Sequence, residues 1–323
     1  MRLATFALAA ATAVLIATPA AAQTRLAIGT TSSSSSHYGY FVAVSQLINK
    51  NVEGVEANVV ETGATLDNLR RLQRNQVDLG LVTTNVAYDV YNGRGEFEGN
   101  AYKPLTLWVY ASAPQNVVVR GDAGIEGLQD LAGKPFNPGI TGSATESTSE
   151  AVFAALGIEP KWARGSTGDI VNQIKDDRVV GYVKSGSGKR LDASSVDIAT
   201  LTPIEIVGLN DEQAATVKEE FPNLSVLSIG ENEAGSGYPA YETWAFGVAA
   251  VAKPDLDEEV AYQITKAIVE DEAAQAAAFS GLKGSEIPEM TISLATTPLH
   301  PGAIRYYEEI GVEVADGLRP EGM

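Results

Sequence analysis

A run of five serines is the first feature of the sequence that could carry chemistry. It lies in GTTSSSSSHYGY, residues 29–40, and ends beside His37, one of two histidines in the chain. The tract is compatible with a flexible linker, the wall of a binding site, or a serine nucleophile whose base is His37. The nucleophile is disfavoured, because adjacent residues entering a helix point in different directions and the tract does not fit G-x-S-x-G. The surrounding sequence has to separate the other two.

Further motifs for catalysis or metal binding are weak. The chain has no cysteine, which excludes thiol catalysis and a metal site of His and Cys ligands. The acidic run DLDEEV, residues 255–260, stands at a predicted helix start, where carboxylates complement the helix dipole. The run SGSGKR, residues 185–190, fits neither a phosphate-binding loop nor G-x-G-x-x-G, so we interpret it as a mobile basic loop at a cleft mouth. His300 precedes a predicted helix, which favours capping or packing over ligand contact. We predict no catalytic residue, metal or cofactor.

Five hydroxyl-rich segments, by contrast, precede predicted helices in both halves of the chain. Each could simply cap its helix, because Ser, Thr and Asn are preferred N-cap residues. Their recurrence at the same kind of strand-to-helix turn favours a further role, in which they surround a cleft with neutral donors and free backbone amides suited to carboxylate oxygens. The segments are residues 33–36, 62–65, 83–85, 141–145 and 166–167.

Charge and the N-terminal segment narrow the class of protein. The formal net charge is -18, which would repel nucleic acid and anionic membranes, so neither is an expected partner. Residues 1–22 combine an early cation, Arg2, an apolar stretch over Leu3–Ile16, and the A-x-A arrangement of Ala20 and Ala22. This pattern predicts a signal peptide and a periplasmic location. Beyond it no run of 18 uncharged apolar residues recurs, so we expect no membrane insertion.

The remaining sequence alternates between strand and helix patterns, which predicts an α/β protein. Its length exceeds what one hydrophobic core usually organises, so two doubly wound lobes are expected, with a hinge and a central ligand cleft. The predicted strands are 25–28, 55–60, 77–84, 179–183 and 244–252. The predicted helices are 38–49, 66–75, 144–156, 167–176, 256–270, an Ala-rich one ending near 279, and 303–310.

Two segments are predicted to cross between the lobes. Lobe 1 would comprise residues 24–113 plus 247–323, and lobe 2 would comprise residues 114–246. The crossing segments carry Trp108, Tyr110 and Trp244, one of which could form the floor of the cleft. Because ligands of doubly wound sheets bind at the carboxyl ends of the strands, the cleft between the lobes is the predicted site.

A family resemblance is carried by stretches that together span nearly all of the chain after the signal peptide. They are IGTTSSSSSHYGYFVAVSQLINK at 28–50, VETGATLDNLRRLQRNQVDLGLVTTNVAYDVYNG at 60–93, VVVRGDAGIEGLQDLAGKPFNPGITGSAT at 117–145, VAYQITKAI at 260–268 and PLHPGAIRYYEEIG at 298–311. On these stretches the chain resembles the TAXI group of solute receptors, which serve tripartite ATP-independent periplasmic (TRAP) transporters. The resemblance implies a type II periplasmic binding protein fold and no enzymatic activity. It also implies a monomer that binds a small organic anion, such as glutamate or 2-oxoglutarate, and delivers it to a TRAP permease for ion-driven uptake.

The same resemblance assigns candidate ligand contacts. The family's binding loops fall on residues 32–38, 62–65, 84–88 and 142–145 of this chain. Serines replace the usual glycines in the first loop, and Glu146 stands where a basic residue is frequent, while Lys184 and Lys189 lie further along the chain. The predicted direct contacts are Ser36, Tyr38, Thr65, Asn85, Ser143 and Thr145, with Tyr88 as a weaker candidate.

Two other functions stay open at this point. The protein could be a sensory receptor that presents its closed form to a membrane sensor, and no feature of the sequence separates that role from transport. It could also be an exported serine hydrolase that uses the serine tract. Ester hydrolysis that disappears in Ser36→Ala would support the hydrolase.

Overall fold

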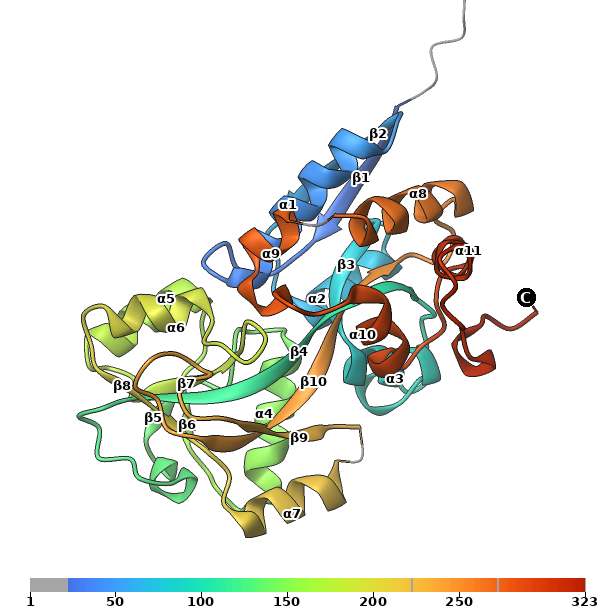
Figure 1. Ribbon diagram of the computed structural model, residues 1–323. Helices are drawn as coiled ribbons and strands as arrows, with labels where there is room; N and C mark the ends of the chain where they lie inside the picture. Colours follow the sequence, from blue (N-terminus) through green and yellow to red (C-terminus); the bar gives the residue numbers. More distant parts are fainter. Residues whose placement is uncertain (1–22, 222, 272, 323) are drawn as a thin grey trace, which may run out of the picture.

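The structure is a computed structural model that describes residues 23–221, 223–271 and 273–322 (Figure 1). The predicted signal peptide, residues 1–22, lies outside the described residues. None of the helices described has both the length and the apolar character needed to cross a bilayer.

Two α/β lobes make up the described chain, and they share one mixed sheet (Figure 1). In the first lobe, β1 pairs in parallel with β2 and β3, and β10 then pairs with β3 in the antiparallel sense. Helix α1 packs against β2, α2 against β3 and α10 against β4. The elements of this lobe are β1 (Thr24–Gly29), α1 (Ser36–Asn51), β2 (Val55–Val60), α2 (Thr65–Gln73), β3 (Leu79–Thr83), α3 (Thr84–Asn92), α8 (Glu258–Val269), α9 (Ala274–Ala278), α10 (Ile287–Leu294) and α11 (Pro301–Glu309), with short 3-10 turns at Gly95–Phe97, Ser280–Leu282 and Asp316–Leu318.

The second lobe is built around the far halves of the two crossing strands. Strand β4 is flanked here by β7 and β8, while β10 pairs with β9. A smaller apolar core lies between these strands and α5 and α6, and it includes Ile170, Ile174 and Ile198. The elements are β5 (Pro135–Phe136), α4 (Ala144–Ala155), β6 (Lys161–Trp162), α5 (Thr167–Lys175), β7 (Gly181–Ser185), α6 (Ala193–Ala199), β8 (Ile204–Val207), α7 (Asp211–Glu220) and β9 (Ser225–Ile229), with a 3-10 turn at Leu128–Leu131.

Strands β4 (Leu105–Arg120) and β10 (Tyr241–Ala252) run through both lobes (Figure 1). They pair with each other from Leu105 to Pro114 of β4, and β4 then pairs with β7 from Gln115 onward. The two strands therefore provide the covalent connection between the lobes and are the natural hinge. The predicted boundaries of the lobes lie beside this change of partner and stay a prediction.

The hydroxyl-rich segments behave in two ways at helix starts. Ser35, Ser143 and Ser166 are N-caps whose side chains accept backbone hydrogen bonds from α1, α4 and α5. Helices α2 and α3 start without a side-chain cap, at Ala64 and Thr83. Their neighbouring hydroxyl groups are therefore not engaged in capping, in contrast to the other three segments.

Most predicted elements are present with ends shifted by one or two residues. Helix α1 starts at Ser36, two residues before its predicted start, because the Ser35 side chain accepts a hydrogen bond from the His37 amide. Strand β7 covers Gly181–Ser185 and not 179–183, because the chain first leaves α5 through Asp177, which has a positive φ of 57°.

Candidate functional site

A small cavity of about 40 Å³ lies between the two lobes. Lobe 1 contributes residues from the turn after β1, the start of α2 and the end of β3, whereas lobe 2 contributes the start of α4 and the end of β7. This placement at strand ends is the one expected for a ligand site between α/β lobes. The polar residues in its wall are Thr31, Ser35, His37, Thr65 and Thr83 from lobe 1, and Ser143, Thr145, Lys184 and Ser185 from lobe 2. We call it the His37 cavity.

Three of the predicted contact residues, Thr65, Ser143 and Thr145, line this cavity. Thr65 Oγ1 accepts from the Thr83 amide at 3.3 Å, and Ser143 Oγ accepts from the Glu146 amide at 3.1 Å. Thr145 Oγ1 donates to Gln115 Oε1 at 2.8 Å. The structure thus brings predicted contact residues from both lobes together, and their role toward a ligand stays a prediction.

The other four predicted contacts lie elsewhere. Asn85 lines a second cavity and donates to Thr148 Oγ1 at 3.2 Å. The guanidinium of Arg94 lies over the Tyr88 ring, 4.9 Å from the centroid of that ring. Tyr38 is half-buried on α1. Ser36 takes part in a contact between the lobes. Their roles toward a ligand stay predictions.

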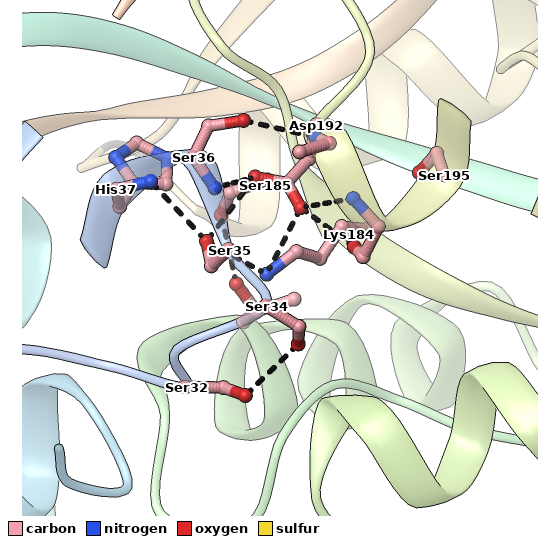
Figure 2. Close-up of polar contacts among 12 residues, drawn as sticks. Ser32, Ser34, Ser35, Ser36, His37, Lys184, Ser185, Asp192 and Ser195 are labelled. Carbon is pink, nitrogen blue, oxygen red and sulfur yellow. Dashed lines mark hydrogen bonds and ion pairs between the residues drawn. The ribbon is translucent and has the colours of Figure 1, made fainter. Parts of the chain in front are cut away.

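A buried carboxylate joins the serine tract to the second lobe (Figure 2). Asp192 Oδ2 accepts from the Ser36 amide at 2.8 Å and from Ser35 Oγ at 3.1 Å. Ser36 Oγ in turn accepts from the Ala193 amide at 2.9 Å. Asp192 is also the N-cap of α6, where its Oδ1 accepts from the Ser194 amide. One carboxylate therefore accepts a backbone hydrogen bond from the start of a helix in each lobe. The tract is therefore part of the closed contact between the lobes.

Lys184 is the cation of this region. Its ammonium lies 3.7 Å from Asp192 Oδ1 and donates to Ser35 Oγ at 3.3 Å (Figure 2). The Asp192 side chain is fully buried and that of Lys184 is 10% exposed. Burial by itself raises the pKa of Asp192, but Lys184, His37 and the hydrogen bonds from Ser194 outweigh it and hold that pKa below its usual value. The Asp192 carboxylate is therefore ionised at pH 7.

His37 forms the aromatic side of the cavity. Its Nδ1 shares a hydrogen bond of 2.8 Å with the hydroxyl of Tyr110 on β4, and Tyr110 stacks on Tyr40 at 3.9 Å. Burial lowers the pKa of His37 to about 4, opposed by the charge of Asp192 and assisted by that of Lys184. The ring is therefore neutral at pH 7, and its Nε2 has no described partner with hydrogen-bond geometry.

Thr83 supplies the second polar atom of the cavity without a described partner. Its residue is buried at the end of β3, and its Oγ1 accepts or donates no hydrogen bond among the described residues. Burying an unpaired hydroxyl costs free energy, so such atoms point to something that completes them. In the sequence, Thr83 stands out only as part of a hydroxyl-rich segment. No local pattern predicts the contact of Asp192 with the serine tract, because Asp192 is 156 positions from Ser36.

The geometry does not assemble a serine nucleophile in the described part of the chain. The His37 ring forms its hydrogen bond with Tyr110. Ser35 Oγ accepts from the backbone amide of His37 and does not bond to the ring. His300 is the N-cap of α11, where its side chain accepts from the Gly302 amide, as the capping interpretation predicts. Lys189 of the basic loop pairs with exposed Glu233 at 2.9 Å.

Two α/β lobes joined by crossing strands, with a polar cavity between them, define the type II periplasmic binding protein fold, and solved structures share it. One is described as a periplasmic transporter (12% identity, TM-score 0.56, covering 89% of this chain and 92% of that chain). Another is a putative L-cystine ABC transporter from Listeria monocytogenes (15% identity, TM-score 0.53, covering 80% of this chain and 97% of that chain). A third is an ancestral arginine-binding protein bound to arginine (16% identity, TM-score 0.50, covering 80% of this chain and 98% of that chain). These identities show the fold alone. By its sequence the chain belongs to the NMT1-like family, which matches residues 28–311.

Proposed function

We propose that this protein is a periplasmic solute receptor that binds a small organic anion in the His37 cavity and delivers it to a TRAP permease. The family and the fold support the receptor class, and the predicted signal peptide supports the location. The observation that carries the ligand class is the wall of the cavity, where a lysine ammonium and several hydroxyl groups from both lobes converge. Glutamate and 2-oxoglutarate are the first candidates, on the family resemblance given above.

The wall can accommodate a carboxylate through three kinds of group. Lys184 carries more donors than its bond to Ser35 uses, because an ammonium has three. The hydroxyl of Thr83 is free to donate. His37 Nε2 carries a proton when Tyr110 donates to Nδ1, and it then offers a third donor without adding charge.

The size of the cavity adds a mechanical expectation. About 40 Å³ corresponds to roughly three water-sized probes, which is less than a ligand such as glutamate requires. Binding such a ligand therefore requires the lobes to move apart about β4 and β10, relative to the closed form described. The ligand-bound protein should be more open than this form, and small-angle scattering can measure the difference.

The ligand class is tested by a melting-temperature screen of amino acids, keto acids and dicarboxylates, because a ligand bound only by the folded state stabilises it. For the best hit, Thr83→Val should weaken binding at least tenfold, since a hydrogen bond to a charged group contributes about 1.5–3 kcal/mol. The melting point without ligand should stay nearly unchanged, because Thr83 Oγ1 has no described partner to lose. Ser33→Ala, at an exposed residue of the serine tract outside the cavity wall, is the control.

The proposal fails if no anion stabilises the protein, or if Thr83→Val and Lys184→Met both bind the best hit as well as the unaltered protein. The permease needs its own assay. Uptake by vesicles that contain the permease should stop when the ion gradient is collapsed. Uptake that instead follows ATP hydrolysis would contradict the TRAP assignment and favour an ABC importer.

A further inference from the structure

A second and larger cavity, of about 240 Å³, lies between the same two lobes. It is bounded by α2, α3 and the Gly95–Phe97 turn on lobe 1, and by α4 on lobe 2. A cavity of 150 Å³ can already hold a molecule the size of benzene, so this one has room for a small ligand. We call it the Asn85 cavity. None of its wall residues belongs to the wall of the His37 cavity.

One amide in this wall is buried and incompletely paired. Asn85 is 4% exposed, and its Nδ2 donates across the lobes to Thr148 Oγ1. Its Oδ1 has no partner among the described residues. A buried carbonyl oxygen without a donor is costly, so the position calls for a donor from outside the chain.

Two opposite charges stand beside that amide. Asp89 follows Asn85 by one helical turn on α3, and its half-buried carboxylate makes no hydrogen bond or ion pair with a described residue. Burial raises the pKa of Asp89, and the charge of Arg94 partly offsets the rise. The guanidinium of Arg94 lies over the Tyr88 ring and contacts no carboxylate in the described part of the chain. The cavity therefore offers one anion and one cation that do not pair with each other.

Apolar residues form part of the remaining wall, with Leu66, Val86 and Phe97 from lobe 1 and Leu224 from lobe 2, beside the polar residues Ser147, Thr148 and Asn223 of lobe 2. We propose that the Asn85 cavity is a second ligand site, which takes a zwitterionic amino acid with an apolar side chain. The ligand's ammonium would donate to Asp89 and to Asn85 Oδ1, and its carboxylate would accept from Arg94. Because the wall comes from both lobes, a bound amino acid would contact both of them.

Titration calorimetry with L-leucine tests this site. L-leucine should bind saturably, and Asp89→Asn and Arg94→Gln should each weaken it at least tenfold, because each removes a charged partner. Both substitutions are at partly or fully exposed positions, so the variants should melt like the unaltered protein. Isopentylamine, which lacks the carboxylate, and 4-methylpentanoate, which lacks the ammonium, should bind more weakly than L-leucine.

Thr83→Val separates the two cavities. It should leave L-leucine affinity within about twofold, while Asp89→Asn should leave binding of the anion found for the His37 cavity unchanged. The proposal is overturned if L-leucine does not bind saturably, if neither Asp89→Asn nor Arg94→Gln weakens it, or if Thr83→Val abolishes it. The last result would place L-leucine in the His37 cavity and would leave the receptor function standing.

Discussion

The His37 cavity and the Asn85 cavity lie between the same lobes, but their charges are satisfied in opposite ways. At the first, the carboxylate of Asp192 and the ammonium of Lys184 are both buried and face each other across a hydrogen-bonded serine. At the second, Asp89 and Arg94 stay apart and partly exposed. Beside the His37 cavity the protein thus neutralises its buried charges with an ion pair of its own. At the Asn85 cavity it leaves the charged side chains to solvent or ligand.

This difference has an energetic reason. Taking a charge out of water is costly, so a fully buried ion must have a partner and additional hydrogen bonds. Asp192 accepts bonds from Ser35, Ser36 and Ser194 as well as facing Lys184. Asp89 is only half-buried, so water can solvate it without a protein partner. Asp192 and its partners should therefore contribute to the stability of the fold, whereas Asp89 should matter mainly for ligand binding.

The largest effect should come from Asp192→Ala. The substitution leaves Lys184 buried without its partner, and it removes the N-cap of α6 and the acceptor of the Ser36 amide at the start of α1. Breaking a buried pair by removing one partner costs about 3–5 kcal/mol of unfolding free energy. Urea denaturation measures the loss. The matched control is Asp197→Ala on the same helix, whose exposed pair with Lys175 contributes less than about 1 kcal/mol.

A companion variant shows whether the unpaired charge causes that loss. Combining Asp192→Asn with Lys184→Met removes both charges, so it should recover a substantial part of the stability lost in Asp192→Ala. If Asp192→Ala and Asp197→Ala prove equally stable, the contrast drawn between a buried pair and a solvated end is wrong.

The second effect is a pH dependence that the His37 cavity contributes through its buried histidine. The folded-state pKa of His37, about 4, lies below the ordinary histidine value of 6.5. As the pH falls, His37 therefore takes up a proton in the unfolded chain before it does so in the folded protein. The stability that depends on neutral His37 is complete above pH 6.5 and is lost as the pH falls toward 4. The loss amounts to about 3 kcal/mol. The lowered pKa of Asp192 acts only below its usual value of 3.8, which is a separate window.

His37→Gln should flatten the dependence of unfolding free energy on pH between 6.5 and 4, because glutamine cannot titrate. Denaturant unfolding at several pH values measures the slope. The second histidine, His300, provides the comparison: its pKa is also lowered by burial, so His300→Gln removes a different share of the slope. A slope that His37→Gln leaves unaltered would mean that folding does not shift the pKa of His37.

The smallest effect should come from Lys189→Met in the basic loop. Lys189 pairs with Glu233, but both side chains are largely exposed, so the pair should contribute less than about 1 kcal/mol. Lys184→Met, five residues earlier, should cost several times more because it strands buried Asp192. Urea denaturation of the two variants side by side measures the contrast. Equal losses would show that burial does not separate these lysines.

Much of the fold could be predicted because its signals are local. The strand over Val55–Val60 and the helix after Ser143 follow from apolar periodicity and from a serine cap, which depend on residues close in sequence. The capping role of His300 was accessible for the same reason. Elements between Ala193 and Ile229 were not predicted, because their short polar helices and edge strands carry weak periodicity.

The sequence accounts for only some of the residues in the candidate site, and their role toward a ligand stays a prediction. The sequence pointed to hydroxyl-rich loops, and the structure places Thr65, Ser143 and Thr145 in one cavity. It also places Asn85 in another, because α3 turns that side chain toward Thr148 on the opposite lobe. Which loop residues share a cavity depends on how the lobes close, and no local pattern encodes that.

By itself, the sequence determined the alternation of strands and helices, the acidic charge and the hydroxyl-rich turns, since composition and short-range spacing fix these. Only the tertiary structure decided the role of the serine tract. Its Ser35 and Ser36 meet Asp192 from the other lobe, more than 150 positions away. The physical reason is that a buried carboxylate and the free amides of a helix start each need a partner, and lobe closure brings them together.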